Sequence, residues 1–139
     1  EGFGLNANYT YADSNIELPG GTLVEIPGYS KDTAAGDVYY EKNGFQARAS
    51  MRKRDDFKGD VYGLGFATTQ VDIKGETIWD AQVGYDFGEA GIESLDGLAI
   101  SFQAQNLTDE PYSTISGDWF VTDFQRYGRT YLLNARYRF

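Results

Sequence analysis

Residues 128–139 alternate strictly between two kinds of side chain. One set of alternate residues, which we call the apolar parity, consists of Tyr131, Leu133, Ala135, Tyr137 and Phe139. The other set, the polar parity, is mostly polar and carries Thr130, Asn134, Arg136 and Arg138. A period of two predicts a β-strand whose two sides meet different environments. A strand of a soluble sandwich alternates in the same way, so this segment alone does not decide what covers the apolar side.

Five earlier segments show the same alternation. We therefore expect an all-β, antiparallel, up-and-down arrangement of about six strands, at 2–12, 33–41, 45–54, 77–87, 97–106 and 127–139. The second and third strands are joined by Lys42-Asn43-Gly44, and Asn-Gly is the strongest short hairpin signal. Long connections rich in Gly and Asp occupy 13–30, 53–76 and 106–125. In the second of these, we expect residues 61–71 to extend the flanking strands above a membrane.

Large aromatic residues of the apolar parity gather at the ends of the expected strands. One end carries Phe3, Tyr40, Phe45, Tyr85, Phe87, Tyr137 and Phe139, and the other carries Tyr11, Trp79 and Tyr131. Two aromatic belts flanking small and aliphatic residues are typical of a membrane-spanning barrel. A soluble sandwich concentrates large aromatic residues in mid-strand. The pattern thus favours a segment of a transmembrane β-barrel.

The polar parity carries charges of both signs. They are Asp37, Glu41, Arg48, Arg52, Asp80, Asp86, Arg136 and Arg138. In a dry core each unpaired charge would cost several kcal/mol. We expect these side chains to face a water-filled or plugged lumen, where the arginines contact either a plug or the acids of the same wall.

Composition excludes several functions. The chain has 12 Lys and Arg against 21 Asp and Glu, a net charge of −9, which argues against a nucleic-acid partner. It contains no His and no Cys. The usual general base and thiolate metal ligands are therefore missing, so we expect no enzyme activity, no cofactor and no metal site. Asp55, Asp56 and Asp60 lack the ligand spacing of a calcium loop. No apolar run approaches the ~20 residues of a membrane-spanning helix.

Three motifs resemble those of a known family. Residues 106–112, Asn-Leu-Thr-Asp-Glu-Pro-Tyr, resemble the N-L-x-D-x-x-Y motif of TonB-dependent receptors, and Gly128-Arg129-Thr130-Tyr131 is similar to their closing G-R-x-Y motif. Residues 27–33 resemble the P-G-x-S-K-H-T segment of one branch, with Asp32 in place of the usual His. Residues 39–41 and 54–57 also match that branch.

The resemblance implies a fold and a function. TonB-dependent receptors are 22-stranded barrels with a plugged lumen, and they import siderophores, vitamin B12 or oligosaccharides across the bacterial outer membrane. This chain would supply the last six strands, since six strands are too few to close a barrel. The implied partners are outer-membrane lipid, the remaining strands and plug, the barrel-assembly machinery, and TonB through an N-terminal part outside this chain. Tyr131, Leu133, Tyr137 and Phe139 would form the assembly signal.

The last long connection holds the best ligand candidates. Aromatic and charged side chains occur together there, as in small-molecule sites: Tyr112, Asp118, Trp119, Phe120, Asp123 and Arg126. Tyr112 and Trp119 would stack on a sugar or an aromatic ligand; alternatively, the connection packs its own aromatic residues. Two other functions stay open for the chain. One is a different outer-membrane barrel, a porin or an adhesin, and the other is a soluble β-sheet binding module.

Overall fold

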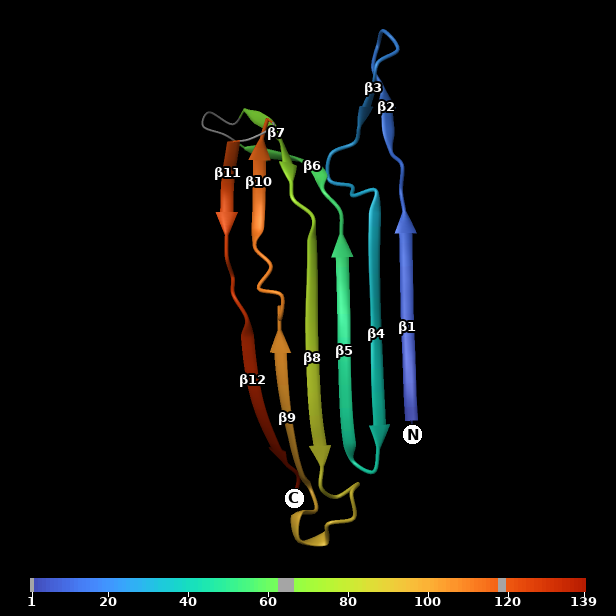
Figure 1. The fold of residues 1–139 in the computed structure, drawn as a ribbon, viewed down its shortest axis with the longest axis vertical. Coiled ribbons are helices and arrows are strands. Elements are labelled where there is room, and N and C mark those ends of the chain that lie inside the picture. The colour runs from blue at the N-terminus through green and yellow to red at the C-terminus, as the bar shows by residue number, and fades with distance from the viewer. Residues whose placement is uncertain (1, 63–66, 118–119) are drawn as a thin grey trace.

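Six long antiparallel strands dominate the computed structural model, which describes residues 2–62, 67–117 and 120–139 (Figure 1). They form one sheet in chain order and comprise β1 (Gly2–Tyr11), β4 (Asp32–Lys42), β5 (Phe45–Arg54), β8 (Glu76–Asp86), β9 (Leu98–Gln105) and β12 (Thr130–Tyr137). Every neighbouring pair is antiparallel. The prediction of an all-β antiparallel fold is confirmed.

The expectation of about six strands is wrong, because the described residues form twelve. The long connections contain β2 (Asn15–Glu17), β3 (Leu23–Glu25), β6 (Phe57–Tyr62), β7 (Thr68–Ile73), β10 (Tyr112–Ser116) and β11 (Phe120–Gln125). β2 and β3 form a hairpin, and the other four form a sheet in the order β11-β10-β7-β6. The short strands pair with one another within and between these connections, which satisfies backbone groups that a structureless loop would leave to water. Within the described residues, none of the three sheets closes on itself.

The two ends of the long sheet differ. At the lower end in Figure 1 lie both termini and the short turns, and at the upper end lie the four-stranded sheet and the β2–β3 hairpin. The lower turn at Asn43 and Gly44 has φ of 49° and 77°, as the Asn-Gly signal predicts. A Cβ on Gly44 would lie 2.2 Å from the carbonyl oxygen of Asp86, so the turn requires glycine. The β8–β9 turn contains a short 3-10 helix, Glu93–Leu95.

Strand boundaries follow the predicted ranges closely except in the last strand. β12 covers Thr130–Tyr137 instead of 127–139. Gly128 has a φ of 77°, a left-handed conformation that interrupts the extended chain before the strand. Arg138 lies beyond β12, although its N–H still donates to Gly97 O at 2.9 Å. Within the part of the chain that the structure describes, no helix has the length and apolarity to cross a membrane.

The register places side chains of one kind on each face of the long sheet. One row across all six strands consists of Phe3, Tyr40, Ala47, Val83, Phe102 and Leu133. The neighbouring row consists of Gly4, Tyr39, Arg48, Gln82, Gln103 and Leu132. We call the two sides the apolar face and the polar face. A slip of one residue in any strand would exchange its two sets of side chains, so the register is strongly specified.

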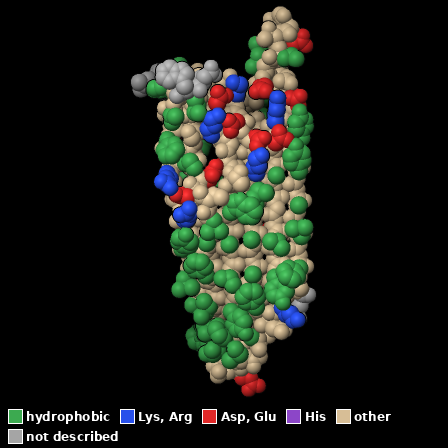
Figure 2. Space-filling view, in the orientation of Figure 1, with side chains coloured by type: hydrophobic (Ala, Val, Ile, Leu, Met, Phe, Trp, Pro, Cys, Tyr) green, Lys and Arg blue, Asp and Glu red, His purple; other side chains and the backbone are tan. Residues whose placement is uncertain are grey.

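Very little of this molecule is enclosed. Its accessible surface is 10023 Å², whereas a compact monomer of 15.5 kDa exposes about 7,200 Å². Among the described residues only two hydrophobic side chains, Val71 and Ala104, are buried. Phe3, Leu5 and Leu133 are each at least 76% exposed. Figure 2 shows hydrophobic side chains spread over the lower part of the visible face, with charges gathered above them. The apolar face therefore requires a cover that the described chain does not supply.

Candidate functional site

The polar face neutralises most of its own arginines. Arg48 Nη2 lies 3.3 Å from Asp37 Oδ2, which also accepts a hydrogen bond from the Asn6 amide. Arg52 and Arg136 make looser pairs, at 3.9 Å with Asp80 and 3.8 Å with Asp86 respectively. Of the two arrangements that the sequence left open, pairing with acids of the same wall is the one observed for these three residues. Within the described chain, Arg138 makes no ion pair.

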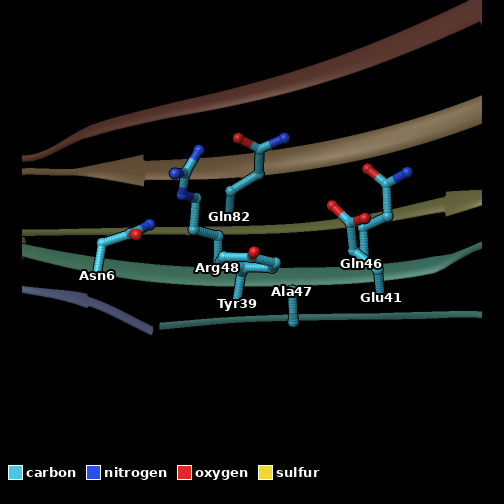
Figure 3. A pocket seen from close by; sticks show the side chains of 7 residues that line it. All are labelled: Asn6, Tyr39, Glu41, Gln46, Ala47, Arg48 and Gln82. Carbon is cyan, nitrogen blue, oxygen red and sulfur yellow. The ribbon is translucent and has the colours of Figure 1, made fainter. Parts of the chain in front are cut away.

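A first depression, which we call the middle hollow, lies halfway along the polar face. It encloses about 420 Å³. Its lining includes Asn6, Tyr39, Glu41, Gln46, Arg48 and Gln82. Figure 3 shows these side chains standing on one side of their strands while Ala47 points to the other. Tyr39 lies over Gly4, where a Cβ would come within 2.1 Å of the ring. The glycine thus lets the aromatic ring lie flat along the hollow's edge.

A second depression, the upper hollow, lies where the long strands meet the upper sheet. It measures about 450 Å³, and its lining includes Arg52, Asp80, Gln105, Asn106, Glu110 and Tyr112. Arg52 and Asp80 come from the polar face of β5 and β8, and Gln105 from the end of β9. Tyr112 begins β10. This hollow therefore joins a residue expected to bind ligand, Tyr112, to two residues expected to face the lumen.

Asn106 holds the upper hollow together. Its backbone has a φ of 53°, a left-handed conformation that asparagine tolerates better than most residues. Its N–H donates to Asp80 Oδ1 at 2.9 Å. Its side-chain amide donates to the carbonyl oxygens of Glu110 and Gly128, at 3.2 and 3.1 Å, and accepts from the Glu110 N–H at 2.9 Å. One side chain thus fixes the connection after β9 to the segment before β12.

The residues after Asn106 add three further ties. Leu107 N–H donates to Trp79 O at 2.8 Å, and the Thr108 hydroxyl donates to Thr77 O at 2.9 Å. Arg129 Nε donates to Leu107 O at 2.9 Å. The chain leaving β9 is therefore bound to β8 on one side and to the start of β12 on the other. These bonds fix the upper ends of three strands, on which the geometry of the hollow depends.

Asp109 and Arg126 form an ion pair beside this junction. The hydrogen bond from Arg126, with the positive charges of Arg126 and Arg129, lowers the pKa of Asp109 below its usual value. The same interaction raises the pKa of Arg126. Asp109 also has a positive φ, 55°. The aspartate of the N-L-x-D-x-x-Y motif therefore anchors the segment between β11 and β12.

Three other predicted ligand residues in the described part of the chain, Phe120, Asp123 and Arg126, do not line the upper hollow. Arg126 is occupied by Asp109, and Asp123 accepts a hydrogen bond from the Gln125 side chain at 2.7 Å. Phe120 is 60% exposed on β11. Asp118 and Trp119 lie outside the described residues. Sequence reasoning missed Gln105 and Glu110 as site residues, although their positions beside and inside the N-L-x-D-x-x-Y motif offered a signal.

The residues expected to form the assembly signal lie on or beside the apolar face. Tyr131, Leu133 and Tyr137 belong to β12 and are exposed. The Tyr131 ring stacks on Phe102 with centroids 6.0 Å apart. Tyr137 and Phe139 meet edge to face at 5.2 Å. These contacts order the aromatic residues along one edge of the sheet, and the signalling role stays a prediction.

The described residues contain no group of three or more metal-ligating side chains suited to hold a metal ion. Comparison with protein-family models, with curated proteins and with solved structures finds no match for this chain.

Proposed function

We propose that this chain forms part of the wall of a β-barrel in the bacterial outer membrane, and that the barrel is a TonB-dependent active transporter for a scarce nutrient. The apolar face meets lipid, and the polar face lines the lumen. One observation carries the proposal: the register brings the apolar side chains of all six long strands onto one exposed face. Lipid is the cover that suits a face of this extent.

The distribution of charge supports the same assignment. Ion pairs lie above the apolar area, including Lys31 with Glu25 at 3.1 Å, Lys53 with Asp55 at 3.0 Å and Lys74 with Asp56 at 2.6 Å. Figure 2 shows the boundary between the lower hydrophobic area and this charged band. Water above the band and hydrocarbon below it account for the boundary, because ionised groups are stable only where water or partners reach them.

The edges of the long sheet require further strands. β1 and β12 each have one neighbour in the sheet. In hydrocarbon, an unpaired backbone N–H or C=O costs several kcal/mol. The proposed barrel therefore includes strands that pair with both edges, as the 22-stranded architecture of TonB-dependent receptors would provide.

A spatial relation between two motifs favours a TonB-dependent transporter over a porin or an adhesin. The N-L-x-D-x-x-Y segment and the G-R-x-Y segment are directly bonded, through Asn106 to Gly128 O and through Arg129 to Leu107 O. Two motifs that recur together in one family are expected to share a structural task. Here that task is to fix the last strand against its neighbour at the mouth of the lumen.

Uptake measurements test the proposal. A strain of the source bacterium lacking the gene is compared with its parent for uptake of labelled ferric siderophores, cobalamin and oligosaccharides. We expect one class to be lost on deletion and to be lost equally when TonB is removed. Uptake that depends on the gene but not on TonB would indicate a porin. Absence of the protein from the outer-membrane fraction would refute the barrel assignment itself.

A further inference from the structure

The upper hollow contains polar groups that the chain does not use. Within the described residues, the side chains of Gln105, Glu110 and Tyr112 make no hydrogen bond or ion pair. Glu110 contributes only backbone atoms to the Asn106 network. Arg52 is held by Asp80 only at 3.9 Å, and its side chain is 66% exposed. An amide, a carboxylate and a phenol are thus free toward one hollow, beside the loosely paired guanidinium of Arg52.

The charge around this hollow is negative. Its lining carries Glu76, Asp80 and Glu110 against Arg52. The connections above the long sheet add to the excess, with three acids and one base in residues 13–31, and four acids and two bases in each of 55–75 and 106–129. Such a field repels anions approaching the mouth. Iron chelates that carry several negative charges are therefore poor candidates for this hollow.

A metal cation is also a poor candidate, because the described residues lack a group of three ligating side chains. A neutral ligand with many hydroxyl groups suits the free groups of this hollow. Each hydroxyl both donates and accepts, so it can satisfy a carboxylate, an amide and a guanidinium in turn. The Tyr112 ring, half-buried at the start of β10, offers an apolar surface to the C–H side of a sugar ring.

We propose that the upper hollow binds a neutral oligosaccharide, an inference that rests on the proposed transport function and selects among its substrate classes. Tyr112 stacks on one sugar ring, Glu110 and Gln105 accept from its hydroxyls, and Arg52 donates to a neighbouring ring. The volume of about 450 Å³ lies within the range of about 300–1,000 Å³ usual for small-molecule sites. Asn106 acts as a positioning residue, since its bonds place Glu110.

Binding measurements on the full-length protein, purified in detergent, test this assignment. The protein is titrated with neutral gluco-, xylo- and manno-oligosaccharides, from disaccharide to hexasaccharide, and separately with an anionic ferric tricatecholate. We expect at least one neutral saccharide to bind and the chelate not to bind. Tyr112→Ala and Glu110→Gln are each expected to weaken saccharide binding by about tenfold, because each removes a direct contact.

Matched variants outside the hollow serve as controls. Tyr62→Ala removes a tyrosine that is 80% exposed on β6, and Glu93→Gln neutralises an acid in the lower turn. Both are expected to bind saccharide as the unaltered protein does. The inference is overturned if no saccharide of the panel binds, if the chelate binds instead, or if Tyr112→Ala and Glu110→Gln bind saccharide unchanged. If deletion of the gene left the TonB-dependent uptake of every nutrient class unchanged, the proposed function itself would be refuted.

Discussion

Replacement of Val83 by arginine tests which face of the long sheet meets lipid. Val83 lies on the apolar face of β8 and is 41% exposed. On this face of β8, Trp79 and Tyr85 belong to the two aromatic belts. The residue midway between them in sequence is Gln82, whose level marks the midpoint between the belts. A rise of about 3.3 Å per residue, reduced by a tilt of about 40°, places Val83 about 2.5 Å from the level of that midpoint.

An arginine at this depth is expected to destabilise a barrel by about 2–4 kcal/mol. The matched variant is Gln82→Arg, one residue away on the polar face. It loses the hydrogen bond that the Gln103 amide donates to Gln82 at 3.1 Å, worth about 1 kcal/mol, but its charge stays in water. We therefore expect Val83→Arg to be the more damaging change by about 1–3 kcal/mol.

The measurement is urea unfolding of the full-length protein refolded into lipid vesicles, followed by the mobility of unheated samples on gels. In a soluble sheet, an exposed Val83 would accept arginine within about 0.5 kcal/mol. Equal free energies of unfolding for the two arginine variants would therefore refute the assignment of lipid to the apolar face. A larger loss of unfolding free energy in Gln82→Arg than in Val83→Arg would assign lipid to the polar face instead.

Three further predictions concern the upper end of the sheet. Asn106→Ala removes three side-chain hydrogen bonds to backbone groups of Glu110 and Gly128, so we expect a loss of about 2–3 kcal/mol in urea unfolding. Because Arg126 lowers the pKa of Asp109, this pair stabilises the protein fully above the unfolded pKa of about 3.9. Its contribution to the free energy of unfolding is lost as the pH falls through the lower pKa of the folded state. The Asp109→Asn variant should not show this loss of stability at acid pH. Gly75→Ala places a Cβ 2.5 Å from the backbone oxygen of Arg54 and should cost about 1–3 kcal/mol.

Each of these predictions has a control on the same sheet. Asn134→Ala removes an exposed amide that makes no hydrogen bond within the described chain, and its urea midpoint should change little. Gly84→Ala brings its Cβ no closer than 3.6 Å to a neighbour, so a loss of stability equal to that of Gly75→Ala would contradict the close-approach argument. For Asp109, the unaltered protein and the Asp109→Asn variant are compared between about pH 5 and pH 3, and identical stability profiles would show that the ion pair contributes nothing.

Local patterns in the sequence predicted much of the fold. Period-two alternation located all six long strands and assigned side chains to two faces, because the direction of a side chain in a strand depends only on parity. The Asn-Gly signal located the turn at residues 43–44, since tolerance of a positive φ is a property of asparagine and glycine themselves. The β2 and β3 strands escaped prediction because they span only three residues each, too short for a periodic signal.

The candidate site depended on contacts between distant parts of the chain. Arg52, Asp80 and Tyr112 meet in the upper hollow although they are separated by up to 60 positions, and no local pattern encodes their meeting. The ties from Asn106 to Gly128 and from Arg129 to Leu107 likewise span 22 positions. The sequence alone determined which side chains share a face. Only the tertiary structure decided which of them meet, because register and strand order are set by pairing between segments far apart in the chain.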